Sequence, residues 1–180
     1  MKLGLGLYRH MLTDDNFQFA RQAGATAIVA HLTDYFHAGP SIPESEADGI
    51  GWAITQNEGK YWTYDELRAL KDRVNAHGLE LAALENFDPS FWYDVLLDGP
   101  KKYEQIEGIK SIIRAMGKAG IPVMGYNFSI AGVWGHVTGP WARGEAETVG
   151  FRGPAGPEER PIRNGQIWNM TYDPDAEPGF

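Results

Sequence analysis

Short apolar segments alternate with longer amphipathic segments along the first 130 residues of this chain. Four of the apolar segments have the length and composition of buried strands, and they span residues 2–8, 27–32, 79–87 and 121–130. Strands that are apolar throughout are typical of a parallel sheet covered on both faces. The amphipathic segments between them predict helices, so the order is β-α-β-α-β-α-β. This repeated βα unit indicates an α/β fold, either a doubly wound sheet or half of a barrel.

The predicted helices carry start and stop signals. They span residues 13–24, 63–78 and 100–120, and each ends at a glycine, which favours the left-handed conformation of a helix terminus. Thr63 and Glu66 have the spacing of a capping box, in which each side chain bonds the backbone of the other residue. The third helix has an apolar stripe that is predicted to face the core: Ile106, Ile109, Ile113 and Met116.

Two long segments lack the period of a helix or a strand. Residues 33–62 are rich in Gly, Pro, Ser and acidic residues and are predicted to form a loop, and a shorter loop with Pro89 and Trp92 follows the third strand. Residues 131–180 are rich in Gly, Pro, Trp and Arg. A structureless stretch of this length is typical of an active-site segment or of disorder. Its aromatic residues argue against disorder, so we expect an ordered cap over the strand ends.

Composition and charge narrow the class of protein. The 180 residues are 43% hydrophobic and carry a formal net charge of -8 at pH 7. A real core is therefore expected, and the acidic balance argues against nucleic-acid binding, which needs a positive surface. No apolar run approaches the roughly 20 residues that cross a bilayer, and no signal peptide is recognised, so we expect a cytoplasmic protein without a membrane partner. Because the chain has no cysteine, disulfides and Cys-based zinc sites are excluded.

Polar residues at the carboxyl ends of the predicted strands are the first candidates for function, because parallel βα proteins bind ligands there. Arg9 and His10 follow the first strand, and Asn127 lies at the end of the fourth. Arg9 either binds a carboxylate through its fork of N–H groups or lies in a solvated turn. Glu85 ends the apolar third strand, where a carboxylate is costly without a partner. It is a candidate metal ligand, base or hydrogen-bond anchor.

Other polar residues have weaker or more ambiguous signals. His31, at the end of the second strand, is interpreted as a histidine satisfied within the sheet. Trp134, His136 and Arg143 combine flat apolar surface with cations, which suits a polyhydroxylated acid, although a loop pinned by its aromatic residues is the alternative. The sequence contains no GxGxxG fingerprint, no P-loop and no His-Glu-x-x-His motif, which disfavours nucleotide cofactors.

The segment Ala119–Phe128, with the sequence AGIPVMGYNF, is followed by Trp134 and resembles the mannonate dehydratase family, in which a similar strand leads into a loop with Trp and Arg. The entry to the second strand at residues 23–26 and the strand that ends at Glu85 also resemble that family. Residues 164–170 resemble one divergent branch of it. The resemblance covers essentially the whole chain.

The resemblance implies a xylose isomerase-like (β/α)8 TIM barrel that uses Mn2+ or Fe2+. It also implies loss of water from D-mannonate, or a related aldonic acid, to give 2-keto-3-deoxy-D-gluconate in hexuronate catabolism. The candidate catalytic residues are then Glu85 and His136. The candidate substrate-binding residues are Arg9, His10, Asn127, Trp134 and Arg143. The metal ligands of the family lie on later strands, so no metal site is expected in this chain.

A full barrel of this kind needs about 250 residues, whereas this chain supplies about four βα units. We therefore interpret residues 1–180 as the N-terminal part of one barrel domain, with residues 1–130 as the core and residues 131–180 as a capping loop. Such a part is expected to be inactive and weakly folded alone, because its sheet has open edges. A homo-oligomer is left open.

Three alternatives remain open from the sequence. A sugar isomerase or epimerase of the same superfamily would move a proton without losing water, so the mass of the product separates the two reactions. A non-catalytic carbohydrate-binding protein would use the Trp-rich segment as its platform and would need no metal. A complete small α/β protein with a disordered tail would be cut by proteases beyond Ala131.

Overall fold

The computed structural model describes residues 2–33, 53–54, 60–127, 136–151, 166–167 and 170–171 of the chain. The order of helices and strands within these ranges follows the predicted βα repeat through the first 127 residues. No helix in the described ranges is long and apolar enough to cross a membrane.

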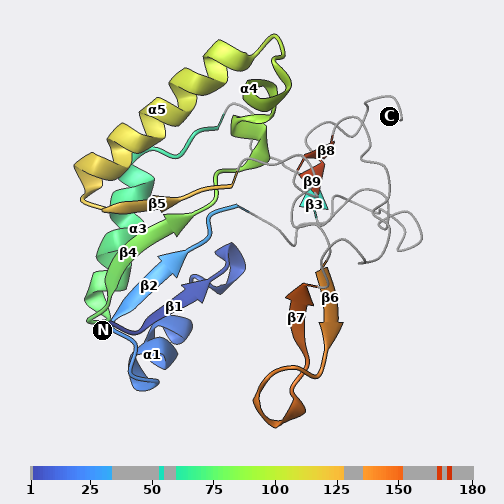
Figure 1. Ribbon diagram of the computed structural model, residues 1–180. Coiled ribbons are helices and arrows are strands. Elements are labelled where there is room, and N and C mark those ends of the chain that lie inside the picture. Colours follow the sequence, from blue (N-terminus) through green and yellow to red (C-terminus); the bar gives the residue numbers. More distant parts are fainter. Residues whose placement is uncertain are drawn as a thin grey trace.

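The main sheet has four parallel strands in the order β1-β2-β4-β5 (Figure 1). These are β1 (Gly4–Leu7), β2 (Ala27–Ala30), β4 (Glu80–Glu85) and β5 (Val123–Gly125). The prediction of an α/β fold with a parallel sheet is therefore confirmed. Within the described residues β1 and β5 are the edges of the sheet, so closure into a barrel stays a prediction.

Three helices form a layer against this sheet: α1 (Asp14–Gln22), α3 (Tyr64–Ala76) and α5 (Lys102–Ala119). α3 contacts both α1 and α5, and Figure 1 shows α3 and α5 side by side along the sheet. The core between the layers is apolar, with Ile28 of β2 and Leu84 of β4 fully buried. The other face of the sheet has no helix on it among the described residues.

The start and stop signals of the helices are confirmed. The side chain of Thr63 accepts a hydrogen bond from the backbone of Glu66, and Glu66 accepts one from the backbone of Thr63, which completes the capping box. Gly24, Gly78 and Gly120 follow the three helices with positive φ angles of 88°, 70° and 73°. These angles explain why each helix ends at a glycine.

The predicted core stripe of α5 was wrong in its register. Ile113 is 53% exposed, and Ile106 and Ile109 are only partly buried. Of the predicted stripe, Met116 alone is buried, and it shares its face with the following residues: Gln105, Gly108, Ile112 and Ala119. The register follows from Gly108, beneath which Tyr61 packs, and from the hydrogen bonds of Gln105, and neither residue contributes to an apolar pattern.

The loop expected after β4 contains two short helices, η2 (Pro89–Phe91) and α4 (Tyr93–Leu97). Gln105 of α5 holds this segment, because its Oε1 accepts from the backbone N–H groups of Asp94 at 2.9 Å and Val95 at 3.3 Å. Its Nε2 donates to the carbonyl of Ser90 at 3.1 Å. The first N–H groups of α4 therefore find their acceptor in a distant side chain, which local sequence does not indicate.

Smaller elements occur in the two segments that were predicted to be irregular. β6 (His136–Gly139) and β7 (Thr148–Phe151) form an antiparallel hairpin with η3 (Arg143–Glu145) in its loop. The other pieces are β3 (Ala53–Ile54), β8 (Gln166–Ile167) and β9 (Met170–Thr171), which pair in the order β3-β9-β8. Most of the rest of both segments lies outside the described residues, and the capping role of residues 131–180 stays a prediction.

Candidate functional site

A cavity of about 420 Å³ opens on the sheet face that carries no helix, at the carboxyl ends of β4 and β5. Apolar side chains of the strands, including Val29 and Ala83, line its floor. Its polar lining includes Glu85, Asn86 and Asn127. The predicted candidates Glu85 and Asn127 thus lie in one cavity, and Asn86, which follows Glu85 at the same strand end, joins them.

The end of β4 turns sharply beside Glu85. The N–H of Asn86 donates to the carbonyl of Gly125 at 2.9 Å, and Asn86 has a positive φ of 64°. A non-glycine residue in this region is uncommon, and asparagine tolerates it better than most. The unusual backbone therefore lies at the cavity wall, directly after the candidate carboxylate.

The side chains of Glu85 and His31 contact each other at this end of the sheet. Nε2 of His31 lies 3.4 Å from Oε2 of Glu85, and their side chains are 14% and 46% exposed. The ring of Tyr8 packs against His31 with centroids 4.9 Å apart. Burial lowers the pKa of His31 below its usual value of 6.5, while the carboxylate of Glu85 acts in the opposite direction.

Arg9 and His10 lie in a short 3-10 helix, η1 (Arg9–Met11), that follows β1. Arg9 lines a second cavity of about 290 Å³ with Trp62, Glu66 and Arg73. The two cavities share no lining residue, so Arg9 is not brought into the cavity of Glu85. The ring of His10 stacks on that of Tyr8, with centroids 6.3 Å apart, and Tyr8 in turn contacts His31.

The candidates on the capping segment are placed only in part. Trp134 lies outside the described residues. His136 begins β6, where its backbone lies opposite Phe151 of β7. The structure does not describe the side chain of His136. Arg143 is exposed in the loop of the hairpin and lines neither cavity.

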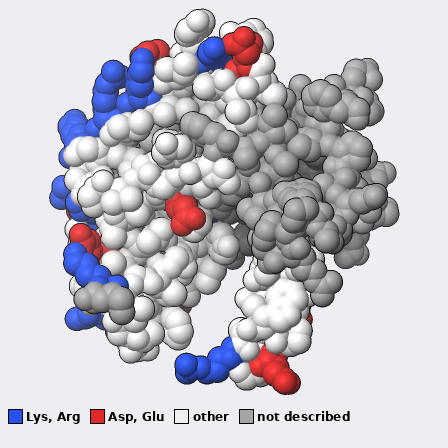
Figure 2. Space-filling view, viewed as in Figure 1, with Lys and Arg blue, Asp and Glu red and all other residues white. Residues whose placement is uncertain are grey.

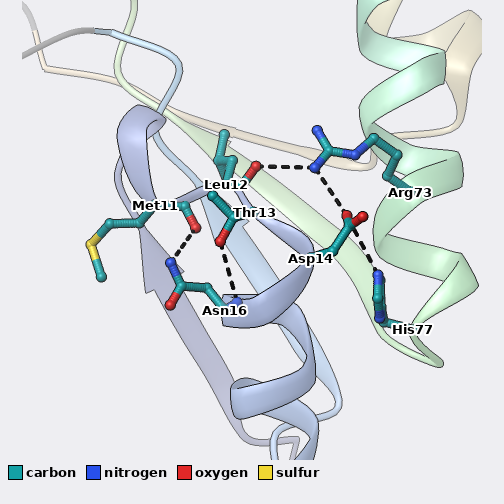
Figure 3. A network of polar contacts seen from close by, with 7 residues as sticks. All are labelled: Met11, Leu12, Thr13, Asp14, Asn16, Arg73 and His77. Atoms are coloured by element: carbon teal, nitrogen blue, oxygen red, sulfur yellow. Dashed lines mark hydrogen bonds and ion pairs between the residues drawn. The ribbon is translucent and has the colours of Figure 1, made fainter.

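A network at the start of α1 fixes the turn that leaves β1 (Figure 3). Nη2 of Arg73 donates to the carbonyl of Leu12 at 3.3 Å and to Oδ1 of Asp14 at 3.0 Å. Nε2 of His77 lies 3.5 Å from the same carboxylate oxygen. The hydrogen bond from Arg73 is the main cause that lowers the pKa of Asp14. This network attaches the turn that carries Arg9 to α3.

Charged side chains are unevenly spread over the molecule. In Figure 2, Lys and Arg gather along the side of the molecule formed by α5 and α3, while the sheet face is mostly uncharged. Among the lining residues of the larger cavity, Glu85 is the charged one. A bound anion therefore needs its cationic partners from residues beyond this lining.

A metal site was not expected in this chain. The described residues contain no group of three or more His, Cys, Asp or Glu side chains that would hold a metal ion. His31 and Glu85 are a pair of such side chains in contact. Catalytic zinc sites use three protein ligands, so this pair does not form such a site by itself.

The parallel sheet, with its helices on one face and polar groups collected at the carboxyl ends of its strands, is the arrangement of βα enzymes. The sequence model of the D-mannonate dehydratase (UxuA) family matches residues 16–146, which is more than half of the chain. The chain therefore belongs to the D-mannonate dehydratase family, as its resemblance indicated.

Individual relatives agree with this assignment. The mannonate dehydratase of Streptococcus equi subsp. zooepidemicus is 39% identical over 70 residues, and that of Thermotoga maritima is 36% identical over 70 residues. Each alignment covers 39% of this chain and 19% of the relative. The crystal structure of mannonate dehydratase from Streptococcus suis serotype 2 has a TM-score of 0.54 at 23% identity, which supports the fold. That match covers 84% of this chain and 37% of the solved chain, so this chain spans only part of its relatives.

Proposed function

We propose that this chain takes part in the dehydration of D-mannonate, or a related aldonic acid, to 2-keto-3-deoxy-D-gluconate in hexuronate catabolism. Membership of the D-mannonate dehydratase family supports the reaction. The carboxylate of Glu85 lies in the wall of a cavity at the strand ends, and this position supports a role for the described residues in that reaction. The relatives named above are mannonate dehydratases, and the proposal extends their reaction to this chain.

In this proposal Glu85 is the base that removes the proton beside the carboxylate of the substrate. Asn127 binds substrate hydroxyl groups, and the floor with Val29 and Ala83 packs against the carbon chain of the sugar. Since Glu85 repels a second anion, the carboxylate of the substrate points away from it. The proposed cationic and aromatic partners of the substrate are Arg9, His10, Trp134 and Arg143, with His136 as a second candidate catalytic residue.

We further propose that a divalent cation, Mn2+ or Fe2+, assists the departure of the hydroxyl group, as the family resemblance implies. The described residues do not form a three-ligand cluster for it. We therefore propose that its ligands come from residues other than those described. We also propose that the 180-residue chain does not turn over substrate alone, since it covers only 37% of the related solved chain.

The test is a titration of the 15N-labelled chain with D-mannonate, with and without Mn2+, followed by the amide signals of Gly125 and Asn127. Binding is expected to shift these signals in the wild type and to persist in Glu85→Gln, because that substitution removes the carboxylate that repels the anionic substrate. Glu80→Gln is the matched control, because Glu80 begins the same strand and pairs with Lys2 at 2.6 Å, away from the cavity. Signals that do not respond to millimolar D-mannonate would sink the proposal.

Mass analysis of the same mixtures separates the alternative functions. Loss of one water supports a dehydratase and contradicts the proposed inactivity of the isolated chain; Glu85→Gln should then lower the rate about 100- to 10,000-fold. A product of unchanged mass indicates an isomerase or epimerase. Binding that is equally strong with and without metal, with no product in any mixture, favours a carbohydrate-binding protein.

A further inference from the structure

His31 and Glu85 reach one point from two neighbouring strands. β2 and β4 are parallel, with Ala30 opposite Leu84, and the next residue on each side is His31 or Glu85. Their Nε2 and Oε2 atoms lie 3.4 Å apart. Glu85 lines the larger cavity, whereas His31 is not part of its lining. His31 therefore contacts the carboxylate from outside the cavity.

The imidazole is held more firmly than the carboxylate that it contacts. The side chain of His31 is 14% exposed, against 46% for Glu85, and Tyr8 packs against its ring. A Cβ at Gly6 on β1 would lie 4.0 Å from Nε2 of His31, and a Cβ at Gly125 on β5 would lie 3.7 Å from Cγ of Glu85. Both distances are ordinary van der Waals contacts, so β1 and β5 pack closely on either side of the pair.

The surroundings of His31 favour the neutral form of its imidazole. Burial is the larger influence and lowers the pKa of His31, while Glu85 on β4 opposes it. On the side of β1, the imidazole of His31 contacts the ring of Tyr8. The ring of His10 stacks on the same tyrosine. At neutral pH the imidazole of His31 is therefore able to accept a proton.

We propose that His31 is a positioning residue for Glu85, which holds the carboxylate at the cavity wall and takes over the proton that Glu85 removes from the substrate. This inference rests on the proposed function, in which Glu85 is the base. The family assignment does not supply it, since it comes from the contact between two side chains of this chain.

The proton passes from the substrate to Glu85 and then to His31. The C–H bond beside the substrate carboxylate breaks, its electron pair stays on the substrate, and its proton goes to Glu85. The proton then moves from the Glu85 carboxyl to Nε2 of His31, which restores the carboxylate and leaves an imidazolium. The substrate releases hydroxide. The imidazolium returns its proton through Glu85 to that hydroxide, so that one water is formed. The restored carboxylate stabilises the imidazolium beside it.

The test is an NMR titration of the 180-residue chain, with histidine side chains and the Glu85 carboxyl carbon observed between pH 4 and about 9, a range that brackets the usual histidine pKa. In the wild type, the Glu85 carboxyl signal is expected to show an inflection at the pH where His31 titrates. That inflection should vanish in His31→Phe, which keeps a ring against Tyr8 but accepts no proton. Merely structural packing of His31 would leave the Glu85 signal the same in both proteins.

Glu85→Gln tests the same contact by changing the carboxylate and keeping the imidazole. The new side chain has nearly the same size, and the position is half-exposed. Removal of the carboxylate should lower the pKa of His31 further, because the attraction that favours the imidazolium is lost. The matched control is Asp14→Asn, which removes a carboxylate 3.5 Å from a different histidine, His77, and should leave the titration of His31 unchanged. A His31 titration that is unchanged in Glu85→Gln would overturn the inference.

Failure of this inference differs from failure of the proposed function. If D-mannonate shifts the cavity amides but Glu85→Gln leaves His31 unchanged, the inference falls and the proposed function stands. If the titrations of His31 and Glu85 are linked but the cavity amides ignore D-mannonate, the proposed function falls. The proton transfer then falls with it, and the pair is structural.

Discussion

Single side chains connect elements that lie far apart in the sequence, and Asp14 is the clearest case. Its carboxylate at the start of α1 contacts Arg73 of α3 and His77, the residue that follows α3 (Figure 3). The same guanidinium also donates to the carbonyl of Leu12, so Arg73 bonds both the turn before α1 and the first residue of α1. These contacts are exposed, and their strength therefore depends on salt.

Asp14→Asn is expected to change how stability depends on pH. Arg73 first, and then His77, lower the pKa of Asp14 from its usual 3.8. A carboxyl group whose folded pKa is lowered stabilises the fold above its unfolded pKa and loses that contribution as the pH falls through the folded value. Asp14→Asn should therefore flatten the fall in unfolding free energy below about pH 4, measured by urea unfolding. Asp15→Asn is the control, and equal flattening in both variants would contradict the role of Arg73.

At this scale the sequence predicted part of the candidate site. Glu85 and Asn127 were found because each ends an apolar strand, and strand ends meet at one edge of a parallel sheet. The partnership of His31 with Glu85 was not predicted, because it depends on the register between strands more than 50 residues apart in the sequence. Asn86 belongs to the same strand end as Glu85, but its positive φ depends on a backbone turn that the sequence pattern does not indicate.

Among the elements, α5 is the one whose packing is least like its hydrophobic pattern. Gly108 faces the core and lies against the ring of Tyr61, and a side chain there would overlap that ring. Tyr61 in turn contacts Phe91 of η2, with ring centroids 5.0 Å apart. One glycine therefore lets a ring from the segment before α3 pack between α5 and the loop after β4.

Substitution of two glycines in α5 tests this packing. Gly108→Ala should lower the free energy of unfolding by about 1–3 kcal/mol, because the new methyl group displaces Tyr61. Gly117→Ala is the matched control, since it lies in the same helix with no atom within 4 Å of a new Cβ. It should raise the free energy of unfolding by up to about 1 kcal/mol through helix propensity. Thermal and urea unfolding measure both, and similar effects of the two substitutions would exclude a close fit of Tyr61.

Element boundaries were predicted well where local signals exist. The capping box at Thr63 and the glycines after the helices depend on short-range bonds, so they can be recognised from sequence. The short helix α4 and the buried face of α5 were missed, because Gln105 and Gly108 are placed by tertiary contacts. A polar or glycine residue on a buried helix face carries no weight in a hydrophobic pattern.

For the whole molecule, the main feature is a parallel sheet with two edges. β1 and β5 each pair with one strand only, within the part of the chain that is described. Val123 on β5 is 52% exposed. Unpaired backbone groups and exposed apolar side chains at a sheet edge promote pairing with another chain. The sequence left a homo-oligomer open, and this arrangement of edges is compatible with one.

We expect the 180-residue chain to associate as its concentration rises, and Val123→Lys to weaken that association. A charge on an edge strand opposes strand pairing. Ile113→Lys is the control, because Ile113 is 53% exposed on α5, away from the sheet edges. Sedimentation velocity over a range of concentrations measures the effect. Association that Ile113→Lys weakens as strongly as Val123→Lys would place the contact on the helices instead.

The bonds of Gln105 also have a consequence for the order in which parts of the molecule open. The amide protons of Asp94 and Val95 are bonded to a side chain of α5, and Gln105 is 2% exposed. Val95 also donates to the carbonyl of Trp92 at 3.0 Å. The amide proton of Asp94 meets solvent when the side chain of Gln105 withdraws, so it should exchange with deuterium together with the amides of α5. The short segment between β4 and α5 is therefore expected to unfold locally together with α5.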